Sequence, residues 1–140
     1  NIIHFDISLE NMLYDPINNQ INLCDFGLSE LFLNNNNNNC ESIKCVKFVG
    51  KSNYKSPEIQ SQIPFNPFKS EIFSMGVCLF IIYFGLPGFS EATLHDMCYT
   101  NILNGHLNTM LMDWDMQIYI DNDMTDLFSK IFVPENKRIN

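Results

Sequence analysis

HFDISLEN at residues 4–11 is followed shortly afterwards by DFG at residues 25–27, and these two motifs decide the fold. Asp6 precedes Asn11 by five residues, and Asp25 opens the second motif. Phosphoryl transfer needs one carboxylate to orient the acceptor hydroxyl and oxygen ligands to hold Mg²⁺ against the phosphates. Each motif on its own is more often a simple turn, or a loop with a hydrogen-bonded carboxylate, than a catalytic site. Their order and spacing together predict a phosphoryl-transfer site.

Composition indicates one globular domain: 140 residues, 46% hydrophobic and 17% charged. The net charge is −8 and Arg138 is the single arginine, which argues against a nucleic-acid or anionic-membrane surface. A solubility feature is the simpler interpretation of the charge. The cysteine count is odd and no CxxC pair occurs, so we expect reduced thiols and a cytoplasmic, reducing compartment; the five are Cys24, Cys40, Cys45, Cys78 and Cys98.

The segments around the two motifs read as short strands and turns. Met12–Tyr14 and Gln20–Cys24 flank a turn cluster at residues 15–19, which predicts a β-hairpin. Residues 34–39 are a run of asparagines that buries no apolar area, so we expect a disordered insertion in a surface loop.

The most apolar stretch, Ile72–Phe89, allows two interpretations. A membrane span needs about 20 apolar residues, but Glu71 stands directly before this stretch, and glycines and a proline interrupt it. A helix that is hydrophobic all round is also typical of a domain core, and we favour that buried helix. Apolar spacing predicts further helices over Glu91–Leu103 and over Thr125–Phe132, the latter capped by Thr125. Residues 108–122 are expected to be mostly loop or short turns.

The two motifs resemble the catalytic loop and the metal-binding DFG motif of eukaryotic protein kinases. Three further stretches continue the resemblance in family order. They match the end of the activation segment, the start of the central helix and a late arginine motif: VGKSNYKSPE at 49–58, KSEIFSMGV at 69–77 and NKR at 136–138. The resemblance implies an α+β fold, mainly helical, with a small β-hairpin next to the catalytic loop.

By this resemblance, residues 1–140 form a partial kinase domain, a C-terminal lobe running from the catalytic loop to the helix before the end of the lobe. The insertion at 34–39 falls in the activation segment. The N-terminal lobe that grips ATP is absent, and the chain begins with Asn1 instead of Met. We therefore expect that lobe upstream in the same chain or gene. We also expect these 140 residues alone to express poorly and to show no phosphotransferase activity.

The resemblance also implies roles for single residues. Asp6 would be the catalytic base, Asn11 and Asp25 would hold Mg²⁺, and Leu13 would form the floor under the adenine of ATP. Other positions would be structural. His4 and Phe26 would stack in an internal column, Glu58 and Arg138 would form a buried ion pair, and Cys78 and Ile82 would face the adenine side.

Four positions depart from the family pattern. Phe5 stands where many kinases have an arginine that receives the activation-loop phosphate. We therefore expect apolar packing of Phe5, and we expect activation-loop phosphorylation not to be the main switch. Ser8 stands where the catalytic-loop lysine belongs, and Lys51 stands where a threonine is expected. One hypothesis is that Lys51 reaches Asp6 and supplies the missing charge; the alternative is that both positions have drifted. Glu71 replaces the Asp that anchors the catalytic loop, and its extra methylene predicts a slightly displaced loop.

The resemblance implies a serine/threonine protein kinase that uses ATP and Mg²⁺ and acts on a protein substrate. The retained Asp6, Asn11 and Asp25 favour an active enzyme. The alternative is a pseudokinase acting as a binding or scaffold module, which the substitutions at Phe5, Ser8 and Glu71 favour. Neither hypothesis involves nucleic acid or a membrane.

Overall fold

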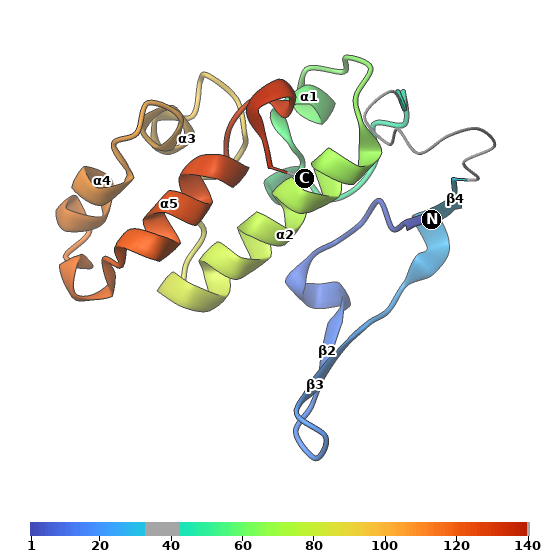
Figure 1. The fold of residues 1–140 in the computed structure, drawn as a ribbon, viewed down its shortest axis with the longest axis horizontal. Coiled ribbons are helices and arrows are strands. Elements are labelled where there is room, and N and C mark those ends of the chain that lie inside the picture. The colour runs from blue at the N-terminus through green and yellow to red at the C-terminus, as the bar shows by residue number, and fades with distance from the viewer. Residues whose placement is uncertain (33–42, 140) are drawn as a thin grey trace.

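The computed structural model describes residues 1–32 and 43–139 (Figure 1), so Cys40 and the asparagine run lie outside the described residues. A strand-rich N-terminal part leads into a helical part. The strands are β1 (Ile2–Ile3), β2 (Met12–Asp15), β3 (Gln20–Leu23) and β4 (Glu30–Leu31). The α-helices are α1 (Pro57–Gln60), α2 (Pro67–Phe84), α3 (Met97–Leu103), α4 (Leu107–Asp113) and α5 (Asn122–Ile131). Short 3-10 helices cover Leu9–Asn11, Phe26–Leu28, Ser52–Tyr54, Gln117–Tyr119 and Glu135–Lys137.

Two small antiparallel sheets frame the N-terminal part. β2 pairs with β3, with Met12 opposite Leu23, over the two segments expected to form a hairpin, and this hairpin extends away from the helices (Figure 1). β1 pairs with β4, with Ile3 opposite Glu30. This second pairing brings both ends of the strand-rich part together beside α2.

The central helix α2 begins and ends earlier than the predicted Ile72–Phe89. The Asn66 side chain accepts hydrogen bonds from the backbone N–H groups of Phe68 and Lys69, which fixes the start before Pro67. Gly85, at φ +79°, ends the helix in the left-handed conformation that glycine tolerates best. The predicted bounds were wrong because the capping residues, and not the extent of the apolar run, determine where the helix begins and ends.

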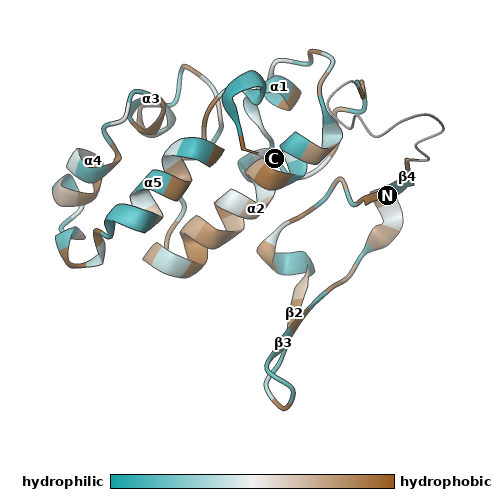
Figure 2. Cartoon of the chain, in the orientation of Figure 1, coloured by the Kyte–Doolittle hydropathy of each residue, from teal (hydrophilic) through white to brown (hydrophobic). Residues whose placement is uncertain are grey.

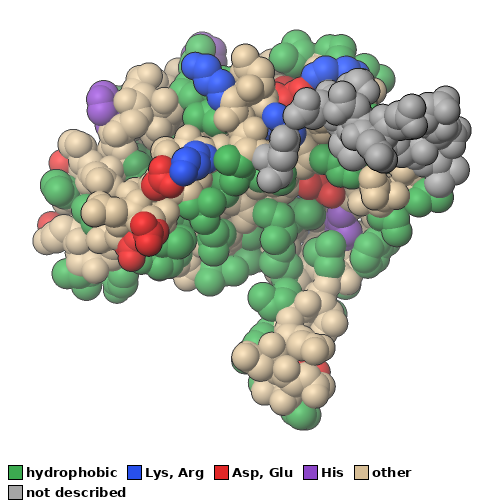
Figure 3. Space-filling view, in the orientation of Figure 1, with side chains coloured by type: hydrophobic (Ala, Val, Ile, Leu, Met, Phe, Trp, Pro, Cys, Tyr) green, Lys and Arg blue, Asp and Glu red, His purple; other side chains and the backbone are tan. Residues whose placement is uncertain are grey.

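α2 is the central helix of the main hydrophobic core, although some of its side chains stay exposed. Figures 2 and 3 show its apolar character and the hydrophobic side chains gathered over it. Phe73 and Phe80 are buried, whereas Ile82 is exposed. Within the described residues, α2 is the one helix long and apolar enough to cross a membrane, but only 44% of it is buried in the protein and core helices pass the same test. It therefore gives no clear evidence for a membrane span.

Aromatic rings fill the space between α2 and α5. Phe80 lies 5.1 Å from Phe128, and Phe128 stacks on Phe132 with centroids 5.6 Å apart. The backbone of α2 lies close to Ile131 of α5 at Gly76, where an added Cβ would come within 2.4 Å of Ile131 Cγ2. A glycine at this position therefore permits the close approach.

Three predictions for the C-terminal part were wrong. The helix expected over Glu91–Leu103 exists only as α3, because the Asp96 carboxylate caps its start. α5 begins before Thr125, and Asp121 caps it instead. The segment expected to be mostly loop or short turns, residues 108–122, contains most of α4, which buries Met110 and Leu111.

Candidate active site

Asp6 and Asn11 lie together in the loop between β1 and β2. The Asn11 side-chain amide donates hydrogen bonds to the Asp6 backbone carbonyl at 2.8 Å and to Asp6 Oδ2 at 3.0 Å. Asn11 is buried, and its backbone N–H bonds the Ser8 carbonyl in a short 3-10 helix. Because the amide nitrogen faces Asp6, the amide oxygen is directed away from it. That oxygen is available as a hard ligand for a cation.

The DFG motif is held next to this loop by hydrogen bonds of Cys24, the residue before Asp25. Cys24 N–H donates to the Asn11 carbonyl at 2.9 Å, and the Cys24 carbonyl lies 3.0 Å from His4 Nε2. Asp25 itself has φ +61°, a conformation uncommon outside glycine. The His4 and Phe26 rings meet edge to face with centroids 4.9 Å apart. The motif and the loop therefore lie side by side.

Asn11 and Asp25 are the two oxygen-bearing side chains of these motifs that were expected to hold a metal ion. Within the described part of the chain, no cluster of three or more His, Cys, Asp or Glu side chains could hold a metal ion. Mg²⁺ in nucleotide sites is usually held by one or two carboxylates together with phosphates and water. The donor set of Asn11 and Asp25 therefore fits Mg²⁺ carried by a nucleotide better than an all-protein metal site.

Glu71, on α2, reaches the backbone of the catalytic loop. Its Oε1 accepts hydrogen bonds from the N–H groups of His4 at 2.5 Å and Phe5 at 2.9 Å. Burial raises the pKa of Glu71, and the two N–H groups partly oppose that rise. The longer side chain thus still anchors the loop to the central helix.

Lys51 crosses from the segment before α1 to the catalytic loop. Its Nζ lies 2.6 Å from Ser8 Oγ, 4.0 Å from Asp6 Oδ2 and 3.5 Å from Glu10 Oε2. Ser8 is fully buried and Lys51 half-buried. The lysine ammonium and the serine hydroxyl therefore meet beside the Asp6 carboxylate.

Phe5 packs as expected, in a second apolar cluster with Ile3, Ile59 and Phe65. Lys47 lies above it, with Nζ 4.8 Å from the ring centroid. Lys47 also pairs with Glu30 at 2.6 Å and donates to the Leu28 carbonyl at 2.6 Å. No local sequence pattern predicts this ion pair, because its two charges stand 17 residues apart.

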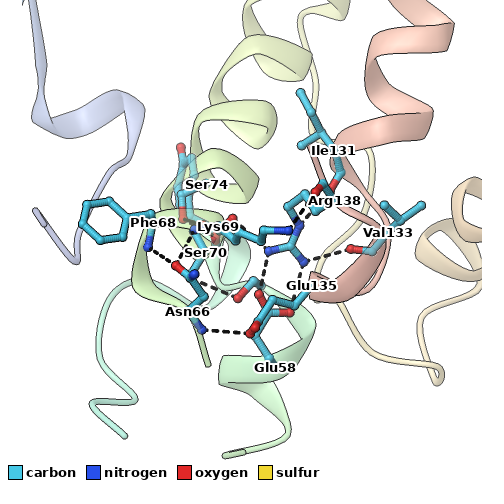
Figure 4. A network of polar contacts seen from close by, with 12 residues as sticks. Glu58, Asn66, Phe68, Lys69, Ser70, Ser74, Ile131, Val133, Glu135 and Arg138 are labelled. Atoms are coloured by element: carbon cyan, nitrogen blue, oxygen red, sulfur yellow. Dashed lines mark hydrogen bonds and ion pairs between the residues drawn. The ribbon is translucent and has the colours of Figure 1, made fainter. Parts of the chain in front are cut away.

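The expected pair of Glu58 and Arg138 lies in a buried polar network (Figure 4). Two parallel hydrogen bonds of 2.6 and 3.0 Å join the guanidinium to the carboxylate. The remaining N–H groups of Arg138 donate to carbonyls, and its plane lies over an aromatic ring: the partners are Lys69, Ile131, Val133 and Phe73. This network ties α1 to α2 and to the end of the chain.

Leu13 and Ile82, which were expected on the adenine side, are more than half exposed. Phe26, which was expected to stack with His4 in an internal column, is also more than half exposed. Cys78, in contrast, is buried in the main core, and burial raises the pKa of its thiol to about 11. The nucleotide roles of these positions stay predictions.

The loop that pairs Asp6 with Asn11 is thus hydrogen-bonded both to the neighbouring DFG turn and to the central helix α2. The family profile described as "Protein kinase domain" matches residues 1–139. The chain therefore belongs to the eukaryotic protein kinase family.

Curated relatives agree with this assignment. The chain is 31% identical to the probable serine/threonine-protein kinase HSL1 of Saccharomyces cerevisiae over 140 residues, 98% of this chain and 8% of that protein. It is 29% identical to testis-specific serine/threonine-protein kinase 2 of Mus musculus over 140 residues, 99% of this chain and 37% of that one. It is 37% identical to serine/threonine-protein kinase Nek6 of Oryza sativa over 93 residues, 66% of this chain and 16% of that one. The chain thus spans less than two fifths of each of these relatives.

Proposed function

We propose that this chain provides the catalytic and substrate-binding half of a serine/threonine protein kinase, which transfers the γ-phosphate of ATP to a protein hydroxyl. The observation that carries the proposal is the hydrogen-bonded pair of Asp6 and Asn11, fastened through Cys24 to the motif that begins at Asp25. The serine/threonine kinases among the relatives support the choice of acceptor.

Each side chain has a role in this proposal. Asp6 Oδ2 accepts the proton of the acceptor hydroxyl as the hydroxyl oxygen bonds to the γ-phosphorus and the bond from that phosphorus to the departing ADP breaks. The Asn11 amide fixes the orientation of the carboxylate. Asn11 and Asp25 hold Mg²⁺, which when bound neutralises charge on the phosphates. Lys51, 4.0 Å from Asp6, supplies the positive charge that the family places at Ser8.

The remaining parts of the active site come from outside these residues. We propose that an ATP-binding lobe precedes Asn1 in the same gene product and that Leu13 forms the floor under its adenine. The exposed position of Leu13 on the hairpin leaves room for that contact. The free thiols of Cys24, Cys45, Cys78 and Cys98 suit a reducing, intracellular compartment.

The test is phosphate transfer by the full gene product from radiolabelled ATP and Mg²⁺ to mixed serine and threonine peptides. Asp6→Asn should lower kcat by about 10² to 10⁴, the usual contribution of a general base. Asp126→Asn is a matched control, because it makes the same change at an exposed position on α5. An Asp6→Asn rate equal to that of the wild type would refute the assignment.

A pseudokinase that acts as a binding or scaffold module is the second candidate. Ser8 in place of the catalytic lysine, together with Phe5, favours it. A full gene product that binds ATP with Mg²⁺ but transfers no phosphate, with binding unchanged in Asp6→Asn, would support this candidate.

A further inference from the structure

Basic residues are concentrated in the segment that leads to the catalytic loop. Four of the eight Lys and Arg residues in this acidic chain are Lys44, Lys47, Lys51 and Lys55, and no acidic residue lies among them. A cationic stretch in a protein of net charge −8 is a local feature that composition does not explain. It marks a surface suited to a negatively charged partner.

Three of these lysines already have partners. Lys44 pairs with Glu135 and Lys47 with Glu30, while Lys51 contacts Ser8 and the acids beside it. Lys55 differs from them, because within the described residues it has neither an acidic partner nor a hydrogen bond from its ammonium. It is half-buried, so part of its hydration is already lost. Lys55 is thus the lysine of this segment whose charge is available to an incoming group.

Lys55 lies in the same hollow as the proposed catalytic base. A small cavity of about 20 Å³ is lined by Asp6, Lys51 and Lys55 together with Gly50 and Glu71. The 3-10 helix Ser52–Tyr54 separates the two lysines. At a rise of about 2 Å per residue, their backbones are on the order of 8 Å apart. An extended peptide advances about 3.3 Å per residue, so this distance corresponds to two or three residues of a bound substrate.

We infer that Lys55 selects protein substrates with an aspartate or glutamate two or three residues from the phosphorylated hydroxyl. This inference rests on the proposed function, since it places the hydroxyl at Asp6. Lys51 holds the charge near the reacting oxygen, and Lys55 pairs with the acidic side chain of the substrate. The recognition is electrostatic and half-exposed, so it weakens as salt is added.

The test uses the full gene product and a set of serine peptides. Each carries one glutamate at a position from three before to three after the serine, and a parallel set carries lysine. Glutamate two or three residues away on one side should raise kcat/KM about fivefold through KM, which is typical of a half-exposed ion pair. Lys55→Glu should reverse this preference toward lysine. Lys137→Glu is the matched control, because it makes the same charge change at an exposed position of the 3-10 helix Glu135–Lys137, and it should keep the preference.

Binding separates this inference from the proposed function. Fluorescence anisotropy of labelled peptides reports affinity without phosphate transfer. If no peptide is phosphorylated but glutamate peptides bind about fivefold more tightly to wild type than to Lys55→Glu, the proposed function fails and the inference stands. Equal binding of glutamate and lysine peptides, or an unchanged preference in Lys55→Glu, would overturn the inference whatever the catalytic rate.

Discussion

Removing the Glu58 carboxylate should destabilise the lobe far more than any surface charge change. In Glu58→Gln the Arg138 guanidinium keeps its three carbonyl acceptors but loses its counter-ion in a site where the two side chains are 4% and 0% exposed. The two hydrogen bonds of 2.6 and 3.0 Å become at best one neutral contact.

The expected magnitude follows from the asymmetry of buried ion pairs. Breaking one from a single side costs about 3–5 kcal/mol, because the remaining charge cannot reach water. A domain of this kind has a total stability of about 5–15 kcal/mol. Arg138→Met should cost more than Glu58→Gln, since it strands a carboxylate and three carbonyl groups. The double variant should cost at least about 1 kcal/mol less than the sum of the two.

Amide hydrogen exchange of the full gene product, followed by mass spectrometry on peptides from α2, measures this loss of stability at the central helix. A loss of 3–5 kcal/mol lowers protection between about 10² and about 10⁴. The control is Asp126→Asn, which breaks the exposed pair with Lys130 on α5 and should change protection by less than about threefold. Protection of α2 in Glu58→Gln within threefold of the wild type would refute the reasoning.

Three further outcomes are expected of the full gene product. Lys51→Met should lower kcat by about a hundredfold, and Ser8→Lys in that background should restore most of it; an unchanged kcat in Lys51→Met would contradict the role. The pKa of Glu71 is raised in the folded state, so the wild type should lose stability relative to Glu71→Gln as pH rises above 4.5. A difference in melting temperature between the two proteins that does not change with pH would contradict this expectation. Burial alone would raise the pKa of Asp96, but hydrogen bonds from backbone N–H groups lower it. Asp96→Ala should therefore lower the free energy of unfolding by about 1 kcal/mol near neutral pH, and by progressively less below pH 3.8. A loss of stability that persists in acid would exclude a role for the charge of the capping carboxylate.

The motifs predicted more of this molecule than the apolar patterns did. Order and spacing located the loop of Asp6 and Asn11, and the expected pair of Glu58 and Arg138 is present although 80 residues separate its members. Helix boundaries were harder, because α3 and α5 start where the Asp96 and Asp121 carboxylates accept backbone hydrogen bonds. Apolar spacing carries no information about a cap that lies before the first apolar residue.

Two other misses have different physical causes. α4 has Leu107, Met110 and Leu111 at helical spacing, but it is so short that its stability comes from packing and not from propensity. The ion pair of Lys47 with Glu30 joins residues 17 positions apart in the sequence, and predicting it requires knowing first that β4, which contains Glu30, pairs with β1.

Ser8 and Lys51 show why a substituted motif is weak evidence for lost activity. When sequence positions are compared one at a time, the missing lysine of the catalytic loop indicates a loss of catalytic activity. In space, a lysine ammonium still lies 2.6 Å from the Ser8 hydroxyl and 4.0 Å from the Asp6 carboxylate, although it arrives from 43 residues further along the chain. Electrostatic stabilisation depends on where a charge lies and not on which backbone carries it. The alternative of drift at both positions requires two independent changes to leave the charge beside the proposed base by chance, so the geometry favours the exchange and the kinetics of Lys51→Met decide it.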